Sequence, residues 1–313
     1  MKIIGISAGT KNGNNDSMCK EALMGAKEMG ADIEFIRLFD LNIKHCTGCN
    51  ACCIAQGTGK GNLCALKDDF DWLLDKMLDA DGVVFAIPIF EKGVAGIFRT
   101  ITDRFGPRMD RGCNVVADKI SMETGGRRVD PRILKDKVVS YIGLGGSDWT
   151  TRFQCDAAMQ AMTPAWKVID NERFSWSTGI IMDDERVKRI HQIGANIANA
   201  AKDIENASYQ GEEGICPHCH SKNFFFDSES TKANCCLCGI EGEIKIIDGK
   251  IKFEFPEEQL GHAHDLLPGK LLHAADIEKN VAKVFELKKS DEYKNRVEKY
   301  KEFITATQRE ITK

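Results

Sequence analysis

Short apolar runs alternate with amphipathic segments over the first two-thirds of the chain. The apolar runs predict five strands, at residues 2–7, 31–38, 81–90, 136–146 and 165–170. Apolar residues at helical spacing predict helices at residues 17–29, 68–80, 93–104, 150–162 and 183–207. Residues 81–90 are nearly all apolar, as expected of a central parallel strand that is covered on both faces. This alternation predicts an α/β fold with right-handed crossovers and a three-layer, doubly wound parallel sheet.

The pattern changes after this region. Residues 111–130 read as an irregular insertion, and a break in composition follows at residues 208–214. Beyond the break, alternating residues flank Asp248-Gly249, which is a strong β-hairpin signal. The charged tail from about Asp276 carries one apolar helical stripe, which favours packing on the main body or on a neighbouring subunit. The stripe consists of Tyr293, Val297, Tyr300 and Ile304.

We therefore expect three domains. They are an α/β domain at residues 1–208 with a cysteine-rich loop at 44–66, a small four-cysteine domain at 211–256, and a helical extension at 257–313. A unit of about 40 residues buries little apolar surface, so a metal ion is expected to stabilise the second domain.

Composition narrows the function. The chain has 313 residues, 42% of them hydrophobic, and a net charge of -4, which gives no general attraction to nucleic acid or to an anionic membrane. The first apolar run is too short for a signal peptide, and no apolar span reaches 18 residues. We expect a cytoplasmic protein, in which thirteen cysteines indicate metal binding or redox chemistry rather than structural disulfides.

The loop after the first strand, "GISAGTKNGNNDS", is rich in small polar residues. Such a loop can direct backbone N–H groups and hydroxyls at a phosphate, and the helix that follows adds a favourable partial charge. It is neither a G-x-G-x-x-G fingerprint nor a Walker loop. The candidate contacts are Ser7, Thr10, Asn15 and Ser17. The alternative is a polar turn in which Asn15 or Asp16 caps the helix.

Five motifs in a fixed order carry a resemblance to a known family. They are "GISAGTKNGNNDS", "HCTGCNAC", "KDDFDWLLDKMLDADGVVFAIPIF", "GVAGIFRTITDRFG" and "GLGG". Together they resemble the NADPH-dependent FMN reductases, and especially the iron-sulfur flavoproteins, over about residues 1–205. The resemblance implies a flavodoxin-like, five-stranded parallel sheet that binds FMN and assembles as a dimer or tetramer. NAD(P)H or a carrier would supply the electrons.

The resemblance also implies which residues contact FMN. The phosphate would lie against the first loop, at Ser7, Gly9, Thr10, Lys11, Asn15 and Ser17. The isoalloxazine ring would lie against Pro88, Ile89 and Phe90, and beside Gly145, Gly146 and Ser147. Gly9-Thr10 stands where relatives often carry Ser-Pro, and Asp103-Arg104 matches a structural pair. We name no catalytic side chain, because the hydride chemistry belongs to the cofactor.

The cysteine-rich loop at residues 44–66 matches the position of a [4Fe-4S] motif in the iron-sulfur flavoproteins. Its ligands would be Cys46, Cys49, Cys52 and Cys64. Eleven residues separate the last two, a longer gap than is usual in that family. Cys53 is either a substitute ligand or a spectator. The alternatives are reduced structural thiols, another metal, or a redox disulfide. Cys19, Cys113 and Cys155 are isolated and read as ordinary small residues.

A second cysteine set consists of two C-x-x-C knuckles with fifteen residues between them. Its members are Cys216, Cys219, Cys235 and Cys238. This spacing, beside a hairpin, predicts a zinc ribbon, with a rubredoxin-like single iron as the alternative. Cys236 is the odd thiol, and His218 and His220 read as exposed loop residues. The roles of the three tail histidines stay open: His262, His264 and His273.

Three functions follow. The main hypothesis is an FMN-dependent oxidoreductase that passes electrons from NAD(P)H or a carrier to an acceptor, through the [4Fe-4S] cluster. A second is a flavin reductase, without a cluster, of one small organic acceptor such as a quinone, azo or unsaturated compound. A third is a redox-sensing flavoprotein whose ribbon docks a partner protein. The ribbon's lysines are interspersed with acidic residues, which argues against nucleic acid as the partner.

Overall fold

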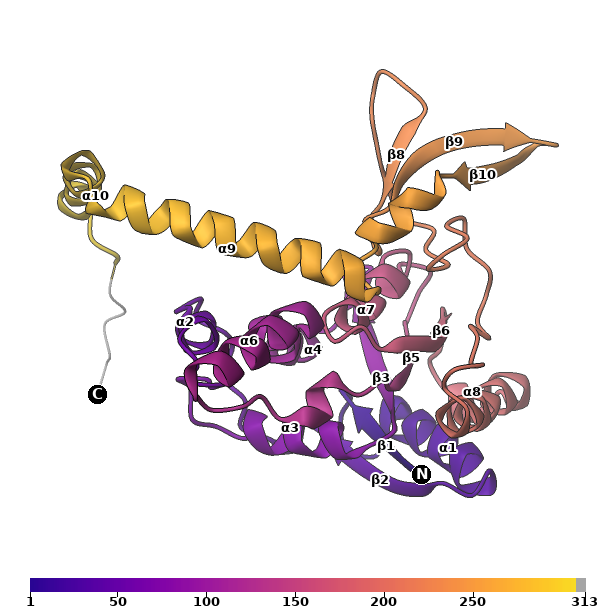
Figure 1. Ribbon diagram of the computed structural model, residues 1–313. Helices are drawn as coiled ribbons and strands as arrows, with labels where there is room; N and C mark the ends of the chain where they lie inside the picture. Colours follow the sequence, from indigo (N-terminus) through magenta and orange to yellow (C-terminus); the bar gives the residue numbers. More distant parts are fainter. Residues whose placement is uncertain (308–313) are drawn as a thin grey trace. The chain divides into compact units, whose positions relative to one another are not determined.

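A computed structural model, which describes residues 1–307, shows an open sheet with helices on both faces (Figure 1). The strands of this sheet are β1 (Lys2–Ser7), β2 (Asp32–Arg37), β3 (Gly82–Phe90), β4 (Gly93–Val94), β5 (Val138–Leu144) and β6 (Lys167–Phe174). Its helices are α1 (Asn14–Glu28), α2 (Ala51–Gly57), α3 (Phe70–Asp79), α4 (Gly96–Thr102), α5 (Gly106–Met109), α6 (Arg111–Thr124), α7 (Phe153–Met162) and α8 (Asp184–Lys202).

Five strands of this sheet are parallel, in the order β2-β1-β3-β5-β6. That is the strand order of flavodoxin-like folds, so the predicted fold class is confirmed. The short strand β4 folds back antiparallel on the end of β3, pairing Ile89 with Val94 and Phe90 with Gly93. Because residue 93 belongs to this hairpin, the next helix begins at Gly96 and not at residue 93 as predicted.

The expectation that residues 111–130 are irregular is wrong, because α6 occupies most of them. The Asp110 side chain accepts a hydrogen bond from the Cys113 amide at 2.9 Å and so caps the helix. Gly125 ends it in the left-handed conformation, with a φ of 66°. The sequence pattern hid this helix because two of its buried residues, Asn114 and Ser121, are polar.

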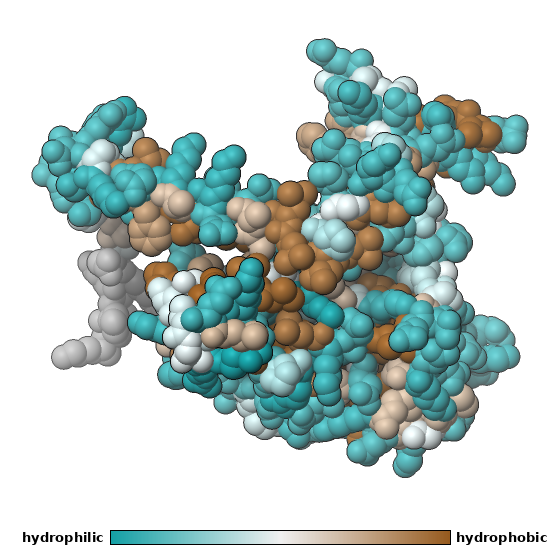
Figure 2. Space-filling view, in the orientation of Figure 1, coloured by the Kyte–Doolittle hydropathy of each residue, from teal (hydrophilic) through white to brown (hydrophobic). Residues whose placement is uncertain are grey.

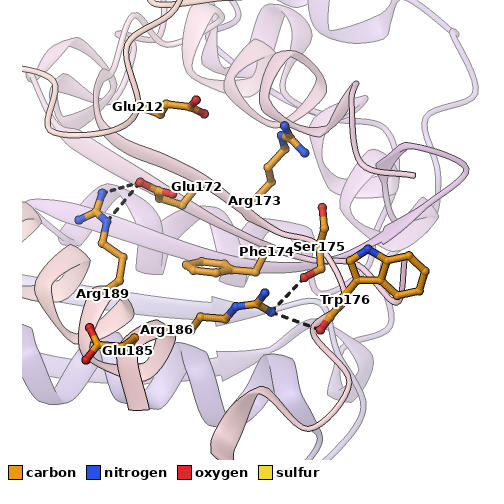
Figure 3. Close-up of a pocket in the computed structure, with 9 residues that line it drawn as sticks. All are labelled: Glu172, Arg173, Phe174, Ser175, Trp176, Glu185, Arg186, Arg189 and Glu212. Carbon is orange, nitrogen blue, oxygen red and sulfur yellow. Dashed lines mark hydrogen bonds and ion pairs between the residues drawn. The ribbon is translucent and has the colours of Figure 1, made fainter. Parts of the chain in front are cut away.

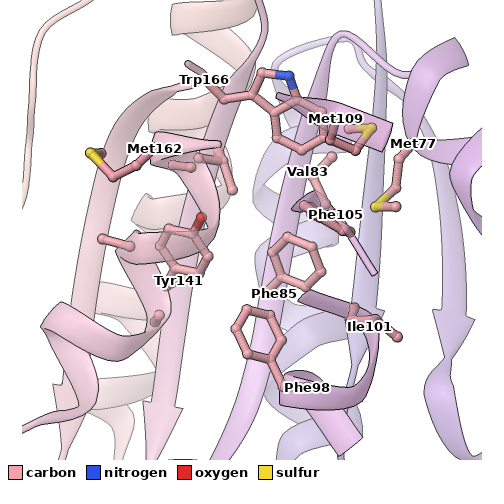
Figure 4. Packing of buried hydrophobic residues seen from close by; sticks show 14 of the residues in the cluster. Met77, Val83, Phe85, Phe98, Ile101, Phe105, Met109, Tyr141, Met162 and Trp166 are labelled. Atoms are coloured by element: carbon pink, nitrogen blue, oxygen red, sulfur yellow. The ribbon is translucent and has the colours of Figure 1, made fainter. Parts of the chain in front are cut away.

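Each face of the parallel sheet covers its own apolar core. Along β3, Val83 and Phe85 belong to one core, whereas Val84 and Ala86 belong to the other. Helices α1 and α8 cover the second core. In the first core the Phe85 ring stacks 5.8 Å from Tyr141 and meets Phe98 edge-on at 5.3 Å (Figure 4). The parallel strands are therefore buried on both sides, as their composition predicts.

A second, antiparallel sheet follows at β7 (Phe224–Phe226), β8 (Lys232–Cys235), β9 (Glu241–Ile247) and β10 (Lys250–Glu254). The predicted hairpin is confirmed between β9 and β10, with positive φ at Asp248 (50°) and Gly249 (72°). Apolar side chains gather on its surface (Figure 2). Its buried residues, among them Ala233 of β8 and Phe253 of β10, belong to the same apolar cluster as Phe153 of α7.

The chain divides into two compact units, residues 1–271 and 272–313. The helix α9 (Leu267–Lys289) begins in the first unit, and α10 (Asp291–Phe303) lies in the second, where the Ser290 hydroxyl caps it. The predicted domain boundaries at 208, 211 and 256 stay predictions. No helix among the described residues is both long and apolar enough to cross a membrane.

Helices α1 and α8 pack closely through glycine. A Cβ added at Gly194 would lie 1.7 Å from the backbone oxygen of Ala22. Gly194→Ala is therefore expected to lower the free energy of unfolding by about 1–3 kcal/mol, the usual effect of overpacking, despite the better helix propensity of alanine. Gly96→Ala on α4 is the control, because its added Cβ meets nothing within 4 Å. Urea unfolding followed by circular dichroism measures both, and equal midpoints would contradict this packing.

Candidate functional site

The first loop lies between β1 and α1, at the carboxyl end of the sheet. Its helix begins at Asn14 without a side-chain cap, which leaves the first backbone N–H groups available to a ligand. The alternative in which Asn15 or Asp16 caps the helix is therefore wrong. Thr10 and Lys11 are exposed, whereas Ser7 is buried.

Asp16 organises this loop from inside. Its buried carboxylate accepts hydrogen bonds from the Ser7 hydroxyl at 2.6 Å, the Asn12 amide at 2.9 Å and Arg37 Nε at 2.8 Å. Burial raises the pKa of Asp16, but these hydrogen bonds and the charge of Arg37 outweigh it and hold the pKa below its ordinary value. Asp16 is therefore ionised, its charge is balanced by Arg37, and its hydrogen bonds hold the loop in place.

Two asparagines link the start of α1 to its surroundings. The Asn14 side-chain amide donates to the Ser177 carbonyl at 3.4 Å, which joins this loop to the one after β6. The Asn15 side-chain oxygen is buried without a hydrogen-bond partner. Rotating that amide by 180° would direct its N–H groups the same way, so Asn15 offers a polar contact to a group bound here. A Cβ on Gly9 would lie 2.5 Å from that of Asn15, so glycine keeps this contact open.

The end of β3 forms the second part of the site. After Phe90 the chain turns through Glu91 and Lys92, whose φ angles of 48° and 70° are uncommon for residues with a side chain. The Arg152 amide donates to the Lys92 carbonyl at 3.0 Å and fixes this turn. Lys92 Nζ lies 5.1 Å from the Trp149 ring centre, a cation–π contact.

The loop after β5 is the third part. The Gly145 amide donates to the Phe174 carbonyl at 2.9 Å, and the Ser177 hydroxyl donates to the Gly145 carbonyl at 3.0 Å. The Ser147 hydroxyl accepts from the Trp149 amide at 3.2 Å. The loops after β5 and β6 are therefore held together, and the Lys92–Trp149 contact joins the loop after β5 to the turn after β3.

The structure thus collects the predicted contact residues at one edge of the sheet. Those of the first loop follow β1, Pro88, Ile89 and Phe90 end β3, and Gly145, Gly146 and Ser147 follow β5. Phe90 and Trp149 expose 63% and 59% of their surface there. The sequence did not indicate that Asp16 holds the first loop in place. It also did not indicate Trp149 and Trp176 as residues of this site. An aromatic residue in a polar loop directly after a strand is the signal that could have identified both tryptophans.

The first cysteine set lies in a different arrangement from the second. Within residues 1–307, the thiols of the loop at 44–66 do not form a group that could hold a single metal ion. A [4Fe-4S] cluster holds its cysteines further apart than a single ion does, so this arrangement does not test the cluster. Cys46 and Cys49 are exposed. Cys64 Sγ accepts from Arg104 at 3.5 Å, and Arg104 forms a buried ion pair with Asp68 at 2.6 Å.

The second cysteine set converges. The sulfur atoms of Cys216, Cys219, Cys235 and Cys238 all lie within 4.8 Å of one another, and three of the residues are buried. Two of the sulfur–sulfur distances are 3.9 Å and 3.4 Å. A tetrahedral ion with metal–sulfur bonds of about 2.3 Å places its sulfurs about 3.8 Å apart, so these thiols fit one ion.

The histidines near this set have other partners. His218 pairs with Asp265 at 2.9 Å, and His220 stacks on Tyr209 at 4.2 Å and pairs with Glu213 at 3.0 Å. Both are partly buried rather than exposed, contrary to the expectation from sequence. The Cys236 thiol is exposed and lies outside the group of four. The roles of His262, His264 and His273 stay open.

The chain resembles several known proteins. A solved flavone reductase is 59% identical, with a TM-score of 0.89 over 99% of this chain and all of that one. A flavone synthase of Aspergillus candidus is 26% identical over 298 residues, 90% of each chain. An iron-sulfur flavoprotein of Methanocaldococcus jannaschii is 38% identical over 108 residues, which are 34% of this chain and 53% of that protein.

Residues 1–179 match the NADPH-dependent FMN reductase family, which is more than half of the chain and includes all three loops described above. This match and the similarity to a flavone reductase and a flavone synthase over most of the chain agree with the strand order of the sheet. The protein is therefore a flavin-dependent oxidoreductase and belongs to the NADPH-dependent FMN reductase family.

Proposed function

We propose that this protein reduces the conjugated carbon–carbon double bond of a flat aromatic compound of the flavone class, with FMN as cofactor and NAD(P)H as the electron donor. The observation that carries this proposal is the 59% identity to a flavone reductase over the whole chain, ribbon and tail included. It corresponds to the hypothesis of a reductase of an unsaturated organic acceptor.

The exposed aromatic residues support this class of acceptor. Phe90 and Trp149 present flat apolar surfaces at the loops where a flavin ring would lie, and a planar polyphenol can stack on them. The strained turn at Glu91 and Lys92 directly follows Phe90, and the Lys92–Trp149 contact orients the indole. A small aliphatic acceptor would not require such surfaces.

The residues at the sheet edge fit FMN. The uncapped start of α1 and the Asn15 side chain, whose oxygen has no hydrogen-bond partner, would hold its phosphate. The predicted contact at Ser7 is wrong for its side chain, because the Ser7 hydroxyl is buried and already donates to Asp16. Backbone groups near Ile89 and Gly145 would face its ring. When bound, FMN would accept a hydride from NAD(P)H and deliver it to the acceptor double bond, and a proton from water would complete the reduction. The chain's own part is to bind and orient both partners.

A second candidate is electron transfer through a [4Fe-4S] cluster at Cys46, Cys49, Cys52 and Cys64. The similarity to iron-sulfur flavoproteins supports it. Iron and acid-labile sulfide analysis of anaerobically purified protein decides between the candidates. Four irons per chain would support the cluster, and their absence from active protein would exclude it.

For the second cysteine set we propose a structural zinc ion, with a single iron as the alternative. Four thiolates close the coordination shell and leave no position for a substrate. The ribbon shares its apolar cluster with α7, so the ion would also stabilise the flavin-binding domain. The homo-oligomer, an electron-transfer partner protein and the cytoplasmic location stay predictions.

The proposed reaction can be tested directly. Under anaerobic conditions, protein with FMN and NADH or NADPH is expected to convert a hydroxylated flavone to a product heavier by one H2, detected by mass spectrometry. Trp149→Ala should raise the acceptor KM about three- to tenfold, because aromatic stacking contributes about 0.5–1.5 kcal/mol. Trp72→Ala is the matched control, since Trp72 is also half-exposed below a lysine but lies on α3. An oxidised donor without any flavone product would reject this acceptor class.

The FMN site can be tested at Asp16. Asp16→Asn removes the charge that orders Ser7 and the Asn12 amide, so the FMN dissociation constant is expected to rise at least about tenfold. Asp40→Asn is the control, because exposed Asp40 is the other partner of Arg37, at 2.6 Å. Quenching of flavin fluorescence measures both constants. A folded Asp16→Asn protein with normal affinity would place the phosphate elsewhere.

Adjacent cysteines test the metal site. Cys238→Ser is expected to lose most of the bound ion and to melt at a lower temperature, because a buried ligand is removed. Cys236→Ser should keep one ion per chain, since that thiol is exposed and lies outside the group. Elemental analysis identifies zinc or iron and gives its amount. Full metal content in Cys238→Ser would show that these four thiols do not form the site.

A further inference from the structure

A cavity of about 490 Å³ lies where β6 ends and α8 begins (Figure 3). Its lining includes Arg173, Ser175 and Trp176. The cavity is next to the proposed flavin site, because the Phe174 carbonyl accepts from Gly145 and the Trp176 amide donates to the Ser147 carbonyl at 3.4 Å. Its volume is in the range that holds a small ligand or part of a dinucleotide.

Most charges around this cavity are already paired. Arg189 contacts Glu172 at 2.7 Å and Asp170 at 2.5 Å. Arg186 pairs with Asp183 at 3.2 Å and also donates to two backbone carbonyls of the loop after β6. These pairs hold the walls in place, and their charges largely cancel for an incoming ligand.

Arg173 differs from its neighbours. Within residues 1–307 no carboxylate lies within ion-pair distance of its guanidinium, and Figure 3 shows it directed away from Glu172. One of its nitrogens donates to the Thr150 hydroxyl at 2.6 Å, and that hydroxyl lies 2.9 Å from the Ser175 hydroxyl. Thr150 is fully buried. The guanidinium is therefore fixed by one hydrogen bond and keeps its other donors for a ligand.

We propose that this cavity binds the phosphate groups of the nicotinamide dinucleotide donor, with Arg173 as their main ligand. The inference rests on the proposed function, which requires such a donor. A guanidinium matches the geometry of a phosphate and binds it with two parallel hydrogen bonds. The exposed Trp176 indole offers a stacking surface to the adenine base.

Two further groups complete the cavity. The Ser175 hydroxyl beside Thr150 can donate to a phosphate oxygen. Glu185 lies exposed in the first turn of α8 and is the one cavity carboxylate without an ion pair among the described residues. Because it repels a phosphate, it fits the sugar instead, where a ribose hydroxyl can donate to it. The nicotinamide end of the same molecule would then extend past Ser147 towards the ring.

Rapid mixing separates the two halves of the reaction. With anaerobic, FMN-loaded protein, Arg173→Gln is expected to raise the donor concentration that half-saturates flavin reduction about tenfold or more. Reoxidation of the dithionite-reduced variant by the flavone should stay within about twofold of the unsubstituted protein. Arg173→Lys should restore part of the loss. Arg99→Gln is the matched control, because exposed Arg99 lies on α4 in a surface pair with Asp103.

Comparing NADH with NADPH identifies the phosphate that is bound. An equal loss for both donors indicates the pyrophosphate, and a loss confined to NADPH indicates the 2′-phosphate. Reduction of Arg173→Gln at normal concentrations of both donors would overturn the proposal. If Arg173→Gln does not retain FMN, Trp176→Ala takes its place, with a rise of about threefold or more expected and no change overturning it. Failure of the unsubstituted protein to oxidise either donor refutes the proposed function instead.

Discussion

The parallel pairing of β1, β3, β5 and β6 is the constraint on which the rest of this protein depends. Parallel strands all end at the same edge, so the loops that follow them must meet there. Direct bonds then fix the loops to one another, from Asn14 to Ser177 and from Gly145 to Phe174. The proposed cofactor site and the Arg173 cavity are both consequences of this shared edge, since the cavity lies just beyond the last strand.

A buried charge gives this edge its order. An unpaired carboxylate with the burial of Asp16 would cost several kcal/mol, and Arg37 and two further donors compensate that cost. Because these bonds satisfy Asp16 internally, the amides at the start of α1 stay available to an anion. The loop can therefore contain a buried carboxylate and still attract a phosphate to its exposed amides. The Arg173 cavity works similarly, since paired charges form its walls and one cation is left for the ligand.

The sequence was sufficient for the sheet and for the positions of its loops, because apolar periodicity and strand order are local or nearly local signals. It was insufficient where contacts over long distances decide. Helix α6 escaped prediction because it buries Asn114 and Ser121 rather than an apolar stripe. Arg173 could not be distinguished from its neighbours, since only the folded chain shows that Glu172 pairs with Arg189 instead. Spacing alone suggested both cysteine sets, and the fold brings only the second together for a single ion.

The structure also changes the interpretation of the ribbon, which is the four-cysteine segment at residues 211–256. A module that docks a partner would be expected to carry its own separate core, whereas the buried residues of this ribbon continue the cluster of α7. Cys155 on α7 packs against the same apolar cluster, which also contains Cys235 and Cys238 of the ribbon, so the two parts are in contact. Helix α7 in turn begins at the end of the loop that carries Trp149. Its Phe153 ring packs so closely on Gly143 of β5 that a Cβ there would clash with it. An ion bound by the ribbon's four thiols would therefore also support the loop beside the proposed flavin ring.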